Sequence, residues 1–186
     1  MNWTEGVDGY TTINGRKCLY LPAYSGVNIA YQPLASFNKG KTIDIAFSVN
    51  NIADYNEPII SICDDPTSET FRGILIYPDR IIVHSRDLNT NDLVQSYQYK
   101  ENTLMSVQIS YAKNYKTNYG NLVTIAVNGV KKCDFAFSGS DNIGTDANII
   151  LGSNSADLSV YSMRVYEKSF DTPDFMQNFV NSLPSK

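Results

Sequence analysis

Short runs in which apolar and polar residues alternate fill this chain almost from end to end. Residues Thr42–Val49 (TIDIAFSV) show the pattern clearly, because the odd positions hold Ile, Ile, Phe and Val while Asp44 and Ser48 lie on the other side. A period of two is that of a β-strand with one face against a core. Similar runs predict the remaining strands at Tyr10–Ile13, Arg16–Leu21, Ile59–Cys63, Gly73–Tyr77, Arg80–His84, Leu93–Tyr99, Leu104–Tyr111, Leu122–Val127, Val130–Phe137, Asn148–Leu151 and Leu158–Tyr166, whereas the segment before Thr42 is less regular and holds one short apolar stretch, Val27–Tyr31. Strands in this number predict two antiparallel sheets packed face to face.

Tight turns separate several of these strands. Asn14-Gly15 and Asn128-Gly129 each lie between two predicted strands, and Asn-Gly tolerates the positive φ angles of a type I′ hairpin turn. Pro78-Asp79 marks a third hairpin between Gly73–Tyr77 and Arg80–His84. The chain order is therefore that of consecutive antiparallel hairpins joined by longer polar loops.

The C-terminal segment changes period. Asp171-Thr172 offers an N-cap carboxylate or hydroxyl, Pro173 lies early in the first turn, and Asp174 follows at the positive end of the helix dipole. Apolar residues then recur at helical spacing: Phe175, Met176, Phe179, Val180 and Leu183. We expect one short terminal helix whose apolar stripe faces the sandwich.

Composition and charge exclude some classes of binding partner. We expect 186 residues with one continuous pattern to form a single domain over 1–186, large enough to bury roughly 70% of its extended-chain surface. The net charge is −4 and no Lys/Arg cluster exceeds two adjacent residues, which argues against a nucleic-acid partner. No apolar run approaches the roughly 20 residues that span a bilayer. The N-terminus lacks signal-peptide features, which predicts cytoplasmic synthesis or a module of a longer chain. Three cysteines without CxxC spacing, Cys18, Cys63 and Cys133, are predicted to be buried free thiols.

Four segments occur in a characteristic order: KTIDIAF, LVTIAVNGV, NIILGS and DLSVYSMRVY. From about Thr11 to Asn181 the chain resembles the concanavalin A-like, laminin-G-like jelly rolls, and its FDTPDFMQNF segment is similar to the closing tail of versions found in bacterial surface proteins and bacteriophage virion proteins. The resemblance implies an all-β, two-sheet antiparallel jelly-roll sandwich with a short C-terminal helix. It also implies a virion, extracellular or cell-surface location. This architecture hosts lectins, glycosidases and structural modules, so function has to be argued from individual residues.

The residues offer little for catalysis. Jelly-roll glucanases carry an E-x-D-x-x-E strand that holds two carboxylates across the sugar bond, and each glutamate of this chain stands alone. The missing triplet leaves open a catalytic pair formed by carboxylic acids that converge from distant loops. His84 is the single histidine, with no serine or cysteine motif to make it part of a nucleophilic pair. We therefore expect a protein that is not an enzyme.

Sugar recognition needs aromatic faces for C–H patches and polar side chains for hydroxyls. His84 and Arg86 share a strand face with Ile82 and would suit sugar hydroxyls or an acidic sugar, although a solvated strand face has the same composition. Tyrosines and an amide in predicted loops and strand ends complete the candidate ligand-binding set: His84, Arg86, Tyr97, Tyr99, Tyr115, Tyr119, Tyr55 and Asn56. For one of Tyr97 and Tyr99, core or edge packing is the simpler interpretation.

Calcium is a second candidate ligand. Asp141, Asn142 and Asp146 lie in a glycine-containing loop and supply the oxygen atoms that Ca²⁺ prefers, as do Asp64, Asp65 and Glu69 elsewhere. Neither set has EF-hand spacing, and loops of this composition are commonly simple turns.

These observations lead to three hypotheses. The first is a non-catalytic, lectin-like recognition module of a bacteriophage virion or bacterial surface protein, which binds a glycan or cell-surface polysaccharide weakly and gains strength from multiple copies in a parent assembly. The second is a structural or decoration module that contacts other virion proteins through an interface of roughly 800 Å² per partner. The third is a glycoside hydrolase or lyase with an unusual acid pair.

Overall fold

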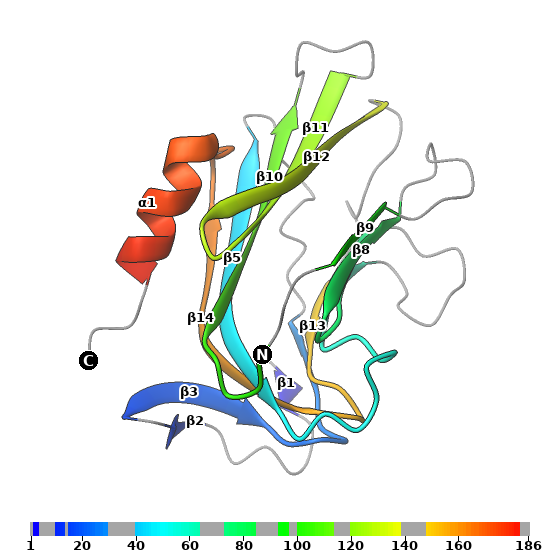
Figure 1. The fold of residues 1–186 in the computed structure, drawn as a ribbon, viewed down its shortest axis with the longest axis vertical. Coiled ribbons are helices and arrows are strands. Elements are labelled where there is room, and N and C mark those ends of the chain that lie inside the picture. Colours follow the sequence, from blue (N-terminus) through cyan, green and yellow to red (C-terminus); the bar gives the residue numbers. More distant parts are fainter. Residues whose placement is uncertain are drawn as a thin grey trace.

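The computed structural model describes residues 2–3, 10–13, 15–29, 40–63, 73–84, 93–96, 100–113, 120–138 and 148–182. Their strands form two antiparallel sheets that face each other (Figure 1). Sheet A has the order β1-β4-β13-β6-β7-β8-β9 and sheet B the order β12-β11-β10-β5-β14-β3-β2. This two-layered architecture confirms the predicted all-β sandwich.

The strand bounds follow the predicted runs closely, except that β1 and β4 were not predicted as strands. Sheet A contains β1 (Asn2–Trp3), β4 (Val27–Ile29), β6 (Ile60–Cys63), β7 (Gly73–Ile76), β8 (Arg80–His84), β9 (Leu93–Ser96) and β13 (Asn148–Leu151). Sheet B contains β2 (Tyr10–Ile13), β3 (Arg16–Leu21), β5 (Lys41–Asn50), β10 (Met105–Lys113), β11 (Gly120–Val127), β12 (Val130–Ser138) and β14 (Asp157–Tyr166). No helix in the described part of the chain has the length and apolar character needed to cross a membrane.

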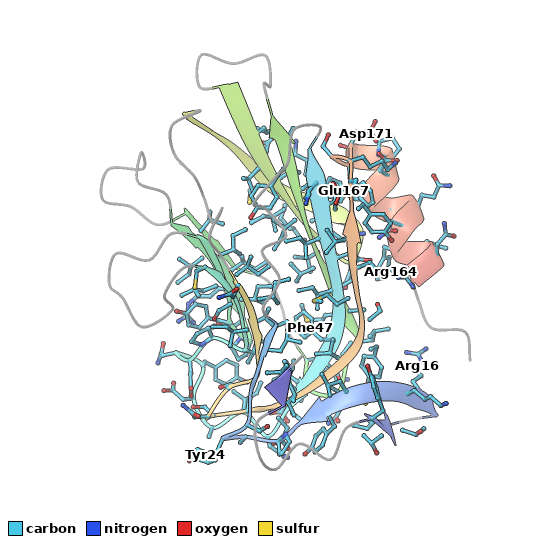
Figure 2. The ribbon with its side chains drawn as sticks, turned by 180° about the vertical axis from the view of Figure 1, so that it is seen from behind. Arg16, Tyr24, Phe47, Arg164, Glu167 and Asp171 are labelled. Atoms are coloured by element: carbon cyan, nitrogen blue, oxygen red, sulfur yellow. The ribbon has the colours of Figure 1, made fainter. Side chains whose placement is uncertain are left out.

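The core fills the space between the two sheets. Ile43, Ile45 and Phe47 of β5 are fully buried and meet the inward residues of sheet A, with Phe47 near the centre of the molecule (Figure 2). The opposite face of β5 is buried as well, since Asp44 and Ser48 are almost inaccessible. The alternation in the sequence does not indicate that further structure also covers this outer face of β5.

The predicted hairpin turns are present. Gly15 separates β2 from β3 with φ +78°, while Asn128 and Gly129 have φ +50° and +76° between β11 and β12. Two positive φ angles in succession are those of a type I′ turn. A Cβ atom at Gly129 would clash with Phe179, so the second turn also sets how closely the helix approaches.

Helix α1 (Thr172–Ser182) lies on the outer face of sheet B, as Figure 1 shows. Asp171 accepts a hydrogen bond from the Asp174 amide (3.2 Å), and Asp174 accepts one from the Asp171 amide (3.3 Å), which makes a reciprocal cap. Phe175 is buried, as predicted. The expectation that the whole stripe faces the sandwich is wrong, because Met176 and Val180 are 44% and 58% exposed. The face of sheet B that contacts α1 is polar and the contact is narrow. Fewer apolar helix residues are therefore buried than the helical spacing suggests.

Candidate functional site

Three loops converge on sheet A and border an open hollow of about 400 Å³. They are the β3–β4, β5–β6 and β13–β14 connections. We call this feature the Tyr24 hollow. It is lined by Tyr24, Ser25, Gly26, Glu57, Pro58, Ser61, Ile150, Gly152, Ser153 and Asn154. Ser61 and Ile150 form part of its floor, because their neighbours along each strand point into the core and strand side chains alternate.

Tyr24 is the distinctive residue of the hollow. Its side chain is 85% exposed and its φ angle is +65°, a conformation rare for an aromatic residue. The backbone is fixed by a hydrogen bond from the Tyr24 amide to the Ser153 carbonyl (3.0 Å). In Figure 2 Tyr24 lies at the opposite end of the molecule from Asp171. The loop therefore presents an aromatic ring to solvent at the cost of backbone strain.

Asp157 holds the loop that carries Tyr24. Its carboxylate accepts hydrogen bonds from the Ala23 amide (2.8 Å), the Tyr20 hydroxyl (2.9 Å) and the Asn51 amide group (2.7 Å). Burial alone would raise the pKa of Asp157, but these hydrogen bonds to the charged form outweigh it and leave the pKa below its ordinary value. The ionised Asp157 thus fixes the loop backbone next to Tyr24 through its hydrogen bond with the Ala23 amide.

Glu57 joins the other two loops. Its carboxylate accepts hydrogen bonds from the Asn154 amide (2.9 Å) and from the Ser155 hydroxyl. Gly152 has φ +107°, and a Cβ atom there would overlap the Ser25 carbonyl oxygen, so only glycine permits the close approach of the β3–β4 and β13–β14 loops. Glu57 and Gly152 together fix the rim of the hollow.

Two residues of the predicted ligand-binding set lie beside the hollow. Tyr55 and Asn56 are exposed and directly precede Glu57 in the β5–β6 loop. Arg80 donates to the Tyr55 carbonyl (3.2 Å) and to the Asn56 side-chain oxygen (3.3 Å), and its guanidinium lies 4.3 Å from the centre of the Tyr77 ring. The structure therefore places this pair next to the hollow and anchors it to β8.

The other predicted residues lie outside the described part of the structure. This holds for Arg86, Tyr97, Tyr99, Tyr115, Tyr119 and the His84 side chain, and also for the calcium candidates Asp141, Asn142, Asp146, Asp64, Asp65 and Glu69. Among the residues that are described, no three His, Cys, Asp or Glu side chains gather closely enough to hold a metal ion. These assignments stay predictions.

Tyr24, Glu57 and Asn154 were missed by sequence reasoning. A tyrosine between Pro22 and Gly26, in a segment without strand alternation, was the available signal for an exposed aromatic residue. The association of Glu57 with Asn154 spans 97 positions and leaves no local pattern.

A second hollow of about 400 Å³ lies between sheet B and the start of α1. Its charged residues are already engaged: Lys131 pairs with Asp134 (2.6 Å), and Asp171 and Asp174 cap the helix. The two aromatic residues that line it, Phe170 and Phe175, are buried. The Tyr24 hollow is therefore the better candidate for ligand binding.

The chemistry of the Tyr24 hollow suits binding more than catalysis. Glu57 is the single carboxylic acid among its described lining residues, whereas glycoside hydrolysis uses two carboxyl groups about 5–10 Å apart. Elsewhere, burial raises the pKa of the Cys18 thiol, which disfavours the thiolate that a cysteine nucleophile requires.

Comparisons with solved structures identify similar folds. The chain superposes on the botulinum neurotoxin type G receptor-binding domain (TM-score 0.64, 13% identity, 97% of this chain and 45% of that chain) and on the binding domain of paraclostridial mosquitocidal protein 1 (0.63, 15%, 96% and 47%). It also matches the botulinum neurotoxin serotype D ligand-binding domain crystallised with N-acetylneuraminic acid (0.67, 13%, 97% and 45%).

The chain spans slightly less than half of each of these structures. No protein-family model matches it, and no curated protein is similar to it in sequence. At these identities the likeness shows the fold: a β-sandwich of the kind found in toxin binding domains.

Proposed function

We propose that this chain is a non-catalytic carbohydrate-binding module that acts on a cell surface or virion, and that the Tyr24 hollow is its glycan site. The observation that carries the proposal is the exposed Tyr24 ring, held in a strained conformation beside polar groups from two other loops. Strained backbone that the surrounding structure maintains is common at ligand sites. The serotype D domain crystallised with N-acetylneuraminic acid supports the ligand class through a shared fold.

The geometry suggests how a sugar would be held. The Tyr24 ring offers an apolar face to the C–H groups of a pyranose, while its hydroxyl stays in water. The Glu57 carboxylate, the Asn154 side-chain amide and the Ser61 and Ser153 hydroxyls supply acceptors and donors for sugar hydroxyls. An open site of this size gives a weak single contact, so useful binding would come from several copies.

The experiment is a glycan array probed with the intact chain and with Tyr24→Asn, which keeps a residue that tolerates positive φ and removes the ring. Tyr10→Ala is the control, because Tyr10 is another highly exposed tyrosine (72%) and lies on sheet B, away from the hollow. We expect selective binding by the parent and by Tyr10→Ala, and a loss of at least about tenfold for Tyr24→Asn, as removing a large contact residue costs more than about 1.4 kcal/mol.

Two further variants separate this site from the residues predicted from sequence. If Arg86→Ala or Tyr115→Ala abolishes binding while Tyr24→Asn does not, the glycan site lies at that residue and not in the Tyr24 hollow. If the parent chain gives no selective signal at any glycan density on the array, carbohydrate binding itself is contradicted.

A protein-contact role is the second candidate, favoured by a different surface. Met176 and Val180 of α1 are exposed, and so is Val130 (49%), which follows the turn that touches Met176. Light scattering of the parent and of Met176→Lys/Val180→Lys tests it. Self-association that disappears in the variant would favour a structural module, and a parent that stays monomeric would count against contacts between copies.

A further inference from the structure

We propose that the Tyr24 hollow selects uncharged sugars and disfavours sugars that carry a carboxylate, and that Glu57 is the residue that determines this preference. The inference rests on the proposed function and adds the chemical class of ligand. It begins with the charge on the lining: Glu57 is the single charged side chain among the lining residues of the described hollow. A ligand carboxylate would meet a like charge there.

Hydrogen bonding leads to the same conclusion. The Glu57 carboxylate already accepts from the Asn154 amide and from the Ser155 hydroxyl, and a carboxylate has about four acceptor positions. The remaining positions can receive hydroxyl donors from a neutral sugar. A carboxylate that replaces one of these hydroxyls brings acceptors only, so a Glu57 position that the replaced hydroxyl would fill stays unsatisfied, and water is displaced from two charged groups.

Among the residues that the structure describes, those around the hollow add to the negative potential. Asp157 lies behind the loop, bonded to Ala23 next to Tyr24, and Asp54 accepts from the Asn56 amide in the β5–β6 loop. Arg80 is the cation of β8 beside this loop, and it is already engaged by Asp79 (2.8 Å), the Tyr55 carbonyl and the Tyr77 ring. It is therefore not free to pair with a ligand carboxylate.

The test uses matched sugar pairs that differ in one carboxylate. Methyl glucoside, methyl galactoside and the two corresponding methyl uronosides are each added as competitors, and we measure how strongly each one inhibits binding of the intact chain to its array ligand. In a second comparison, binding to each neutral array oligosaccharide is measured beside binding to its sialylated counterpart. We expect the neutral member to bind at least about tenfold better at low salt, with the gap narrowing at high ionic strength because exposed charges are screened.

Two variants assign the preference. Glu57→Gln keeps the shape and removes the charge, so the ratio of neutral to acidic binding should fall severalfold whatever the change in absolute affinity. Asp134→Asn removes the same charge from the exposed surface of sheet B and should leave the ratio unchanged. Asp134 lies outside the hollow lining.

The outcomes separate the two proposals. Acidic members that bind as well as neutral ones, through a site that Tyr24→Asn abolishes, would overturn the charge inference and leave glycan binding standing. A ratio that Glu57→Gln does not move would overturn the role of Glu57. If no member of any pair binds, the proposed function falls, and this inference falls with it.

Discussion

Tyr24 occupies a backbone conformation that opposes folding. A left-handed residue with a Cβ atom costs roughly 1–2 kcal/mol, a cost that glycine avoids. We therefore expect Tyr24→Gly to leave the free energy of unfolding unchanged or raise it by up to about 1 kcal/mol, while glycan binding is lost. Urea denaturation together with the array measures both quantities on one variant.

Tyr55→Gly is the control for this experiment, because Tyr55 is an exposed loop tyrosine without a positive φ angle. It should lose about 0.5–1 kcal/mol through the extra freedom of glycine in the unfolded chain. Equal destabilisation by the two substitutions would show that Tyr24 is not strained.

Asp157 makes the fold depend on pH. Its folded-state pKa is lowered, so the stabilisation it provides is present above the unfolded value of about 3.9 and is lost as pH falls through the folded-state pKa. Asp157→Asn should cost about 1 kcal/mol at neutral pH, below the ~1.5–3 kcal/mol of buried charged hydrogen bonds because water reaches this site. The difference from the parent should shrink below about pH 4. A constant difference between pH 2 and 7 would contradict this role.

At the scale of elements, α1 tests what helical spacing can and cannot predict. Phe175 is 1% exposed and packs edge to face against Phe170, whereas Met176 is 44% exposed. We expect Phe175→Ala to lower the free energy of unfolding by about 3 kcal/mol and Met176→Ala to change it by less than about 0.5 kcal/mol. Chemical denaturation followed by circular dichroism compares them. Similar losses for both would mean that the helix packs on a different face.

The contact between α1 and sheet B contains a buried acid. Asp44 accepts hydrogen bonds from Ser106 (2.9 Å) and from Asn178 of α1 (2.8 Å), and Arg164 lies across the strand pair. Burial raises the pKa of Asp44, and these partners offset the effect only in part.

The sign of the pH effect is opposite to that of Asp157. A raised folded-state pKa means that the contribution of Asp44 is fully present below about pH 3.9 and is lost as pH rises through the folded-state value. The stability of Asp44→Asn relative to the parent should therefore increase with pH above about 4. Unfolding free energies measured from pH 3 to 8 would show this slope, and a flat difference would mean that the pKa of Asp44 is the same in the folded and unfolded states.

These elements also show where sequence reasoning succeeds. Strands and turns follow from local signals, since alternation sets β5 and Asn-Gly sets the β11–β12 hairpin. The burial of Asp44 does not follow, because it depends on Asn178, which is 134 positions away. The partial exposure of α1 also depends on a distant part of the chain. The face of sheet B that contacts the helix is polar, and this cannot be predicted from the helix sequence.

At the scale of the whole molecule, the candidate site is a product of topology. Tyr55 and Asn56 could be named from the sequence because an aromatic residue beside an amide in a polar loop is a local signal. Tyr24 and Glu57 line one hollow only because β13 pairs with both β4 and β6, which brings three loops to one end of sheet A. The jelly-roll order predicts such convergence in general, but it does not specify which loop side chains line the hollow.

The size of the hollow sets how the intact molecule would be used. About 400 Å³ lies at the small end of ligand sites and fits one or two sugar rings, so a single chain should bind weakly. Linking copies turns later contacts into intramolecular ones and raises apparent affinity by about 10²–10⁴ when the spacing suits the ligands. We therefore expect a tetravalent display of this chain to bind a dense glycan surface at least about 100-fold more tightly than the single chain does. The advantage should disappear on a sparse surface and in a tetravalent Tyr24→Asn display. A single chain that binds dense and sparse surfaces equally tightly would instead indicate a deep, self-sufficient site outside the Tyr24 hollow.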